Sequence, residues 1–229
     1  WACDPTPKCL AEVQERATVA RTFGDYEEAL RAGPDYVWVC TPNRLHAPVA
    51  VAALEAGADV LCEKPLADTV EAGEAIVDAV GRTGRTLLLG YTLRWFPGFR
   101  FIHDTIAAGR IGTVIGARTR LHGYRSLEWA RTDYRWHERA ALLLDYSHEI
   151  DYLRWFLGEI AEVKAFATTR GRRQHVVHPN IVDAVMRFAD GPLATLHFDY
   201  VQRPDKREVQ IFADDGMLYY DAGNDCLDF

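Results

Sequence analysis

The sequence predicts an α/β fold: an incomplete doubly wound parallel sheet, followed by an α+β domain with a mostly antiparallel sheet. In the first half, short apolar runs alternate with stretches whose apolar residues recur at helical spacing. This β-α-β-α-β alternation is typical of a parallel sheet covered by helices. In the second half, several strand-like runs follow one another with turn residues between them, which favours antiparallel pairing.

Apolar runs and turn residues locate the elements of the first half. An unbroken apolar run over 36–40 is stopped by Pro42, which predicts a short buried strand. Gly57 marks the end of the helical pattern that comes next. The elements that follow are a helix over 44–58, a strand over 59–62, a helix over about 68–82 and a strand over 86–91.

The second half predicts helices on one face of a larger sheet. Gly191-Pro192 is typical of a hairpin turn between two of its strands. The predicted helices are 99–108 and 142–158, and the predicted strands are 112–124, 161–169, 181–189, 193–201, 208–213 and 217–221.

The opening of the chain predicts that the parallel sheet is incomplete. A dinucleotide-binding domain begins with a strand, a Gly-x-Gly-x-x-Gly turn and a helix, and that glycine pattern occurs nowhere in the 229 residues. Trp1–Asp4 instead resembles the end of the second strand, with Asp4 in the place of the ribose-binding acid. We expect a piece of a longer polypeptide, with 1–91 a partial dinucleotide-binding domain and 92–229 a truncated substrate domain.

A lysine follows the strand at 59–62. Lys64 lies between Glu63 and Pro65 at the carboxyl end of that strand, where α/β folds bind ligands. A lysine there can hydrogen-bond a substrate hydroxyl and stabilise the oxyanion as a carbonyl forms. The alternative is a surface strand that simply ends in charged residues and proline.

A histidine and an aspartate lie together in the predicted helix 142–158. Asp145, His148 and Tyr152 share one helix face at i, i+3 and i+7, apart from the apolar stripe that suits the core. A histidine beside a carboxylate can take a proton from a secondary alcohol. We predict His148 as the acid/base and Asp145 as its catalytic partner; the alternative is a structural polar pair.

Three motifs resemble one enzyme family. Thr41–His46, Glu63–Leu66 and Gly90–Trp95 are similar, in order and spacing, to motifs of the Gfo/Idh/MocA family of nicotinamide-dependent oxidoreductases. The resemblance extends from Ala2 to about Asp221. It implies a Rossmann domain followed by an α+β domain, and it supports the catalytic roles of Lys64 and His148.

The resemblance also implies a cofactor site. The cofactor is NAD, with NADP as the alternative, and an acid at Asp4 would favour NAD because it repels the additional phosphate. The residues implied to border its ribose and phosphates are Thr41, Pro42, Asn43 and His46, and those at its nicotinamide end are Glu63, Lys64 and Arg94.

The substrate implied by the resemblance is a sugar, inositol or nucleotide sugar, oxidised at a secondary hydroxyl. Aromatic and charged residues after the strand at 112–124 could stack on and hydrogen-bond such a compound, or form a subunit contact. The candidate substrate-binding residues are Lys64, Tyr124, Trp129, Tyr134, Arg135, His148 and Tyr152.

Composition predicts a soluble cytoplasmic enzyme. Hydrophobic residues make up 48% and charged residues 26%, with no apolar run long enough to cross a membrane. A net charge of -7 argues against a nucleic-acid partner. The cluster Arg170–Arg173 is interpreted as a solvated turn or a contact to a substrate phosphate. A sheet face open to water, as in relatives, favours a homo-oligomer, either a dimer or a tetramer.

Metal binding is not predicted. The five cysteines lack metal-ligand spacing, and free thiols are the simplest interpretation. A zinc site could be imagined from His175, His178 and His197, but no compact cysteine and histidine pattern supports it.

Three functions remain open at this level. The first is hydride transfer with Lys64 and His148, and the second is glycosidic cleavage by a relative that uses NAD transiently. The third is a non-catalytic, sugar-binding fragment. Net accumulation of NADH separates the first two, and loss of cofactor binding would favour the third.

Overall fold

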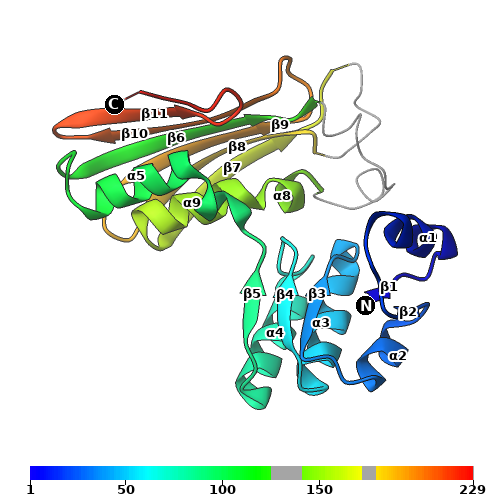
Figure 1. The fold of residues 1–229 in the computed structure, drawn as a ribbon. Helices are drawn as coiled ribbons and strands as arrows, with labels where there is room; N and C mark the ends of the chain where they lie inside the picture. The colour runs from blue at the N-terminus through cyan, green and yellow to red at the C-terminus, as the bar shows by residue number, and fades with distance from the viewer. Residues whose placement is uncertain (125–140, 172–178, 229) are drawn as a thin grey trace. The chain divides into compact units, whose positions relative to one another are not determined.

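The computed structural model describes residues 1–124, 141–171 and 179–228. The chain divides into two compact units, Trp1–Gly90 and Tyr91–Phe229 (Figure 1). The first unit contains small parallel sheets with helices, and the second contains a larger, mostly antiparallel sheet. The predicted fold class is therefore confirmed. Across the described ranges, no helix combines the length and the apolar character needed to cross a membrane.

The parallel strands of the first unit form two separate sheets. Strands β1 and β2 pair with each other, while β3, β4 and β5 form a three-stranded sheet in that order. The strand bounds are Ala2–Cys3 for β1, Thr22–Phe23 for β2, Tyr36–Val39 for β3, Asp59–Cys62 for β4 and Leu87–Leu89 for β5.

Residues that commonly cap helices mark both ends of α4 in the first unit. The hydroxyl of Thr69 accepts a hydrogen bond from the Ala72 N–H at 3.2 Å, and Gly84 adopts a φ of 65° at the other end of α4. The predicted helix 44–58 is shorter than expected and opens with a 3-10 turn, η1. The helix bounds are Pro7–Arg16 for α1, Tyr26–Arg31 for α2, Asn43–Leu45 for η1, His46–Glu55 for α3 and Val70–Thr83 for α4.

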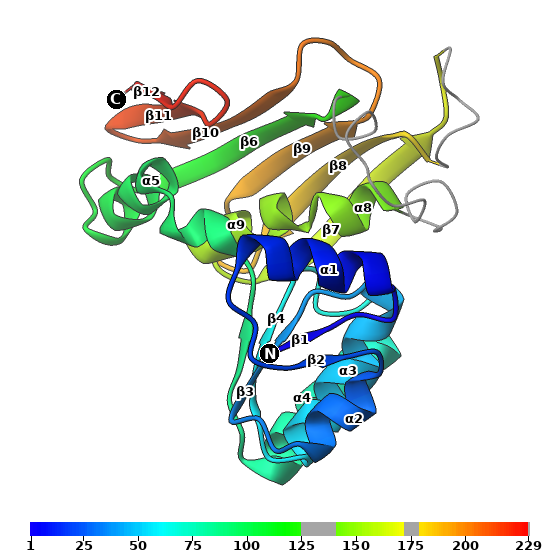
Figure 2. The same cartoon turned by 45° about the vertical axis from the view of Figure 1, so that its right-hand side comes forward.

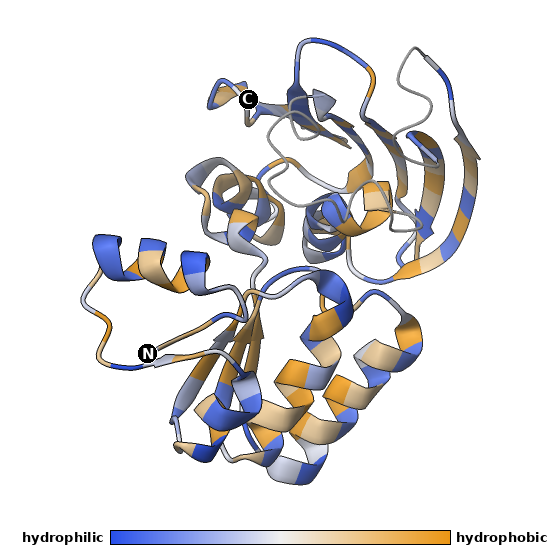
Figure 3. Ribbon diagram, turned by 90° about the vertical axis from the view of Figure 1, so that its right-hand side faces the viewer, coloured by the Kyte–Doolittle hydropathy of each residue, from blue (hydrophilic) through white to orange (hydrophobic). Residues whose placement is uncertain are grey.

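Helices α3 and α4 pack on one face of the three-stranded sheet, whose strands are mostly apolar (Figure 3). Val39, Leu54 and Ile76 lie in the resulting core. The other face carries Tyr36 and Trp38, which are 79% and 64% exposed. One face of this sheet is therefore buried, and the other exposes aromatic side chains.

The second unit is built on a seven-stranded sheet in the order β12-β11-β10-β6-β9-β8-β7. Neighbouring strands are antiparallel except β6 and β9, which are parallel. The bounds are Val114–His122 for β6, Ile160–Thr168 for β7, Ile181–Phe188 for β8, Leu193–Asp199 for β9, Lys206–Ala213 for β10, Gly216–Asp221 for β11 and Cys226–Asp228 for β12.

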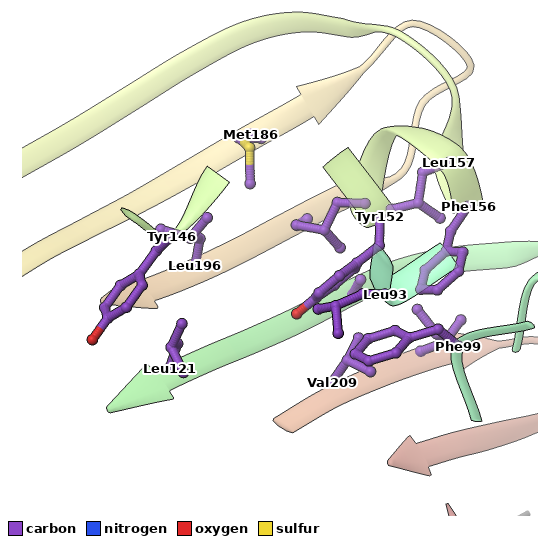
Figure 4. Packing of buried hydrophobic residues seen from close by; sticks show 14 of the residues in the cluster. Leu93, Phe99, Leu121, Tyr146, Tyr152, Phe156, Leu157, Met186, Leu196 and Val209 are labelled. Atoms are coloured by element: carbon purple, nitrogen blue, oxygen red, sulfur yellow. The ribbon is translucent and has the colours of Figure 1, made fainter. Parts of the chain in front are cut away.

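The helices of the second unit lie together on one face of this sheet (Figures 1 and 2). Figure 4 shows their core contacts, among them Tyr152 beside Phe99, with ring centroids 4.7 Å apart. The single helix predicted over 142–158 is wrong, because the chain forms two helices with a break at Tyr146. The bounds are Thr92–Trp95 for the 3-10 turn η2, Pro97–Ala107 for α5, Ala141–Asp145 for α8 and Ser147–Leu157 for α9.

Candidate functional site

Three loops of the first unit leave the same edge of its three-stranded sheet. Val39 is in register with Cys62, and Cys62 with Leu89, so the parallel strands end level. The pairing continues into the loops, where the Glu63 N–H donates to the Val39 carbonyl at 2.9 Å and the Gly90 N–H donates to the Cys62 carbonyl at 2.8 Å. The carboxyl edge of an open parallel sheet is where α/β proteins bind ligands.

His46 ties two of these loops together. Its Nδ1 lies 2.7 Å from the Pro65 carbonyl oxygen, and its Nε2 lies 2.9 Å from the Thr41 carbonyl oxygen. The side chain is only 1% exposed. His46 therefore holds the loop after β3 against the loop after β4, which is a positioning role rather than the direct cofactor contact that the sequence predicts.

Two polar groups in the loop after β3 are buried without a partner among the described residues. They are the Thr41 hydroxyl and the Asn43 amide nitrogen, on either side of Pro42. Burying a donor without an acceptor costs free energy, and such orphaned groups call for an explanation. A ligand rich in acceptor oxygens, such as the ribose or phosphates of a dinucleotide, would satisfy both.

Lys64 is half-buried in the loop after β4, and its peptide bond to Pro65 is cis. Gly90, after β5, packs directly against this loop. A Cβ at Gly90 would lie 3.2 Å from Glu63 Oε2 and 3.3 Å from the Cys62 carbonyl oxygen. A side chain at position 90 would therefore displace Glu63, the neighbour of Lys64.

Asp4 lies at the end of β1, as the sequence predicts. Its Oδ1 accepts a hydrogen bond from the Thr6 N–H at 2.7 Å, and its own N–H donates to the Phe23 carbonyl at 3.1 Å. These bonds fix the carboxylate at the strand end.

In the second unit, His148 lies near the start of α9. The residue is 8% exposed, and its ring stands edge-on to Tyr91, with centroids 5.5 Å apart. Burial raises the pKa of the Tyr91 phenol, so this hydroxyl stays protonated over the physiological range. Tyr91 is a neighbour of His148 that sequence reasoning missed.

Asp145 and Tyr152 do not share the helix face that the sequence predicts, because the helix breaks between them at Tyr146. Asp145 is buried and accepts a hydrogen bond from the hydroxyl of Tyr200. Tyr152 is fully buried, and its hydroxyl is hydrogen-bonded to Thr119 on β6. Tyr152 is therefore part of the core, and substrate binding is not proposed for it.

Arg94, predicted at the nicotinamide end of the cofactor, forms a bidentate pair with Asp151. Its Nε and Nη2 lie 2.8 and 2.6 Å from the two carboxylate oxygens, and its guanidinium lies 5.5 Å from the centroid of Trp155. These contacts join η2 to α9. No sequence signal indicated the pair, since its partners are far apart along the chain.

The remaining substrate candidates follow β6. Tyr124 is buried, with the guanidinium of Arg203 3.6 Å from its ring centroid. Other residues singled out from the sequence lie outside the described ranges: Trp129, Tyr134, Arg135, Arg172, Arg173, His175 and His178.

Two family models match the chain. Residues 2–91 match an oxidoreductase family with an NAD-binding Rossmann fold, and residues 99–219 match the Gfo/Idh/MocA C-terminal domain. The chain belongs to the Gfo/Idh/MocA family. The predicted family and its NAD cofactor are thereby confirmed.

This chain is similar to several members of the family. It is 33% identical to a 1,5-anhydro-D-fructose reductase of Ensifer adhaerens over an alignment of 194 residues, which covers 80% of this chain and 56% of the relative. An oxidoreductase domain protein from Kribbella flavida superposes with a TM-score of 0.85 at 28% identity, over 97% of this chain and 64% of that one. A levoglucosan dehydrogenase in complex with NADH and levoglucosan gives 0.85 at 25% identity, over 96% and 63%. This chain thus spans less than two thirds of each of these relatives.

Proposed function

We propose that this protein transfers a hydride between a nicotinamide cofactor and a secondary hydroxyl of a sugar, inositol or nucleotide sugar. The observation that carries the proposal is the level carboxyl edge of β3, β4 and β5, where Lys64 and two buried, unpartnered polar groups follow neighbouring strands. An edge built in this way fits a dinucleotide.

The cofactor would be held by the loops that His46 fastens. The Thr41 hydroxyl and the Asn43 amide would donate to oxygens of the cofactor, which gives both groups partners when it binds. Asp4 at the end of β1 would accept from a ribose hydroxyl and favour NAD over NADP. The cofactor supplies the hydride acceptor, or the donor in the reverse direction.

Lys64 would act on the oxygen of the reacting carbon. Its ammonium group donates a hydrogen bond to the hydroxyl and stabilises the negative charge that develops as the carbonyl forms. A half-buried lysine suits this role, because reduced access to water strengthens the interaction.

His148 would carry the proton. As the hydride leaves carbon, the hydroxyl proton passes to the neutral imidazole, and in the reverse direction the imidazolium returns it. The Tyr91 ring packs against the imidazole edge and restricts its orientation. Asp145, fastened by Tyr200, would fix the chain segment that precedes His148.

The substrate class rests on the relatives. The names 1,5-anhydro-D-fructose reductase, levoglucosan dehydrogenase and inositol 2-dehydrogenase all denote enzymes of cyclic polyhydroxylated compounds. A compound of this class is the proposed substrate here. A homo-oligomer is proposed as well, because Phe166, Val185 and Leu193 expose apolar surface on the sheet face opposite the helices.

The test is NADH formation from NAD⁺ over a panel of inositols, anhydro-sugars and nucleotide sugars. With the best substrate, Lys64→Ala should lower kcat by about 10²–10³-fold, as expected for loss of one oxyanion donor. Lys164→Ala, which changes an exposed lysine on β7, is the matched control and should leave kcat unchanged.

The outcomes separate hydride transfer from glycosidic cleavage. Net accumulation of NADH supports hydride transfer. Release of a sugar without net NADH would indicate the glycosidase chemistry instead, and an active Lys64→Ala variant would remove Lys64 from the mechanism.

A further inference from the structure

The sheet face opposite the helices carries a polar cluster that the proposed function does not use. Alternate residues of β6, β8, β9 and β10 point to this outer face, which holds a depression of about 750 Å³. At the end of the parallel strands β6 and β9, His122 is in register with Asp199, and His197 precedes Asp199 by two residues on the same face. The register thereby brings two imidazoles and a carboxylate together.

The three groups have the spacing of a metal ligand set. The His197 Nε2 lies 2.9 Å from Asp199 Oδ2, and the His122 Nε2 lies 3.8 Å from the same oxygen. The three ligand atoms all lie within 4.8 Å of one another. Two imidazole nitrogens and a carboxylate oxygen can surround one divalent ion after movements of a few tenths of an ångström to about one ångström.

His122 supplies the observation that points to a ligand. Its side chain is 7% exposed, and Nε2 is buried with no hydrogen-bond partner among the described residues. This nitrogen faces the carboxylate of Asp199 at a distance too long for a hydrogen bond. A cation between the two groups would give the nitrogen a partner.

Neighbouring groups orient the other two ligands. The Nδ1 of His197 lies 2.7 Å from Asp183 Oδ1 on β8, the carboxylate-histidine arrangement that turns the second imidazole nitrogen toward a metal. Asp199 Oδ1 accepts the N–H groups of Val201 and Gln202 at 2.6 and 2.5 Å, which leaves Oδ2 facing the histidines.

The side chain of Gln202 stands where the ion would bind. Its amide nitrogen lies 2.7 Å from Asp199 Oδ2 and 3.0 Å from His197 Nε2. A donor placed between two potential metal ligands occupies the position of a cation. Because Gln202 is exposed, its side chain can swing out and make room.

We propose that His122 Nε2, His197 Nε2 and Asp199 Oδ2 bind a divalent transition-metal ion of the Zn²⁺ class, with Asp183 as the positioning residue for His197. Nitrogen and carboxylate ligands of this kind suit Zn²⁺. The ion would fasten the end of β6 to the end of β9, and through Asp183 to β8. The role is therefore structural or regulatory, and the site lies within the second unit.

The experiment titrates Zn²⁺ against the full chain without cofactor, free of any affinity tag, in competition with a chromophoric chelator. We expect saturable binding that His122→Gln or His197→Gln weakens by more than the roughly 10–100-fold typical of an outer-shell change. Asp183→Asn should fall within that range. Gln202→Ala, which removes the competing amide, should bind at least as tightly as the unchanged chain.

Further measurements distinguish this site from metal binding by other histidines or by cysteines of the chain. A double variant His175→Gln/His178→Gln should keep the affinity, and the Co²⁺ complex should lack the charge-transfer bands of thiolate ligands. Zn²⁺ should raise the Tm of the unchanged chain but not that of His122→Gln, with both showing the same circular dichroism without metal. Absence of saturable binding, or undiminished binding by His122→Gln, would overturn the proposal.

Discussion

At the residue scale, His46 joins the loops that follow β3 and β4. Its two ring nitrogens contact the carbonyl oxygens of Thr41 and Pro65, and its side chain is buried. His46→Ala would leave these oxygens without a protein partner and open a space between the loops. We expect a loss of about 1–3 kcal/mol in the free energy of unfolding, measured by urea denaturation.

The matched change is His103→Ala, on the partly exposed face of α5. It should cost less than His46→Ala, because the ring of His103 is not enclosed between two loops. Equal losses of unfolding free energy for the two variants would contradict the role of His46 in holding the two loops together.

Cysteine reactivity gives a second test at this scale. Burial, with a further contribution from the Glu63 carboxylate, raises the pKa of Cys62 to about 12. The thiolate is the reactive form, so its population at neutral pH is very small and it rises only as the pH approaches that pKa. In the folded protein, iodoacetamide should modify exposed Cys9 well before buried Cys62, as read by mass spectrometry of peptides. Fast labelling of Cys62 before unfolding would show that the β4 core is open.

Single residues were predictable where a local rule applies. Lys64 follows the end of an apolar strand, so the sequence alone predicted its place at a carboxyl end. Thr41 and Asn43 were implied by the family resemblance, and the strand register shows that both loops leave the same edge. The pairs Asp145–Tyr200 and Arg94–Asp151 join distant segments. No local pattern specifies such partners, and the expectation of Arg94 at the cofactor came from the family resemblance instead.

At the scale of elements, α9 shows both the strength and the limit of periodicity. Tyr146, Leu153 and Leu157 are buried as their spacing predicts. The break at Tyr146 could not be predicted from this spacing, because the apolar stripe continues across the break. The backbone there leaves helical geometry, with φ of -101° and ψ of 27°. The predicted common face of Asp145, His148 and Tyr152 depended on an unbroken helix.

An ion pair between a buried carboxylate on α9 and a partly exposed guanidinium on β10 joins this helix to the sheet. The Nε of Arg207 on β10 lies 2.8 Å from Oε1 of Glu149, whose side chain is fully buried. Arg207→Leu would leave a buried carboxylate without this partner. We expect a loss of about 3–5 kcal/mol in unfolding free energy, measured by chemical denaturation.

The double variant Glu149→Leu/Arg207→Leu is the informative control. It removes both charges, so it should be more stable than Arg207→Leu alone. Additive losses from the two single changes would show that the pair is not coupled.

At the scale of the whole molecule, the order of elements was predicted better than the contacts between distant ones. Alternating strands and helices, followed by a series of strands, specified the class of each unit. The sequence did not indicate that β6 pairs with β9 in parallel, because strand order depends on long-range pairing. The proposed metal site depends on that pairing, which explains why the histidines considered from the sequence did not include His122.

The central claim is that the carboxyl edge of β3, β4 and β5 binds the nicotinamide cofactor. The most direct test is an NADH titration of the full chain, followed by energy transfer from its tryptophans to the nicotinamide. Gly90→Val should weaken binding, because a side chain there displaces Glu63 from the loop of Lys64. Gly81→Val, at a position in α4 where a Cβ would meet nothing within 4 Å, should bind as the unchanged chain does. Saturable transfer that Gly90→Val reduces is the predicted result, and transfer that never saturates, or that Gly90→Val leaves unaltered, would contradict the account.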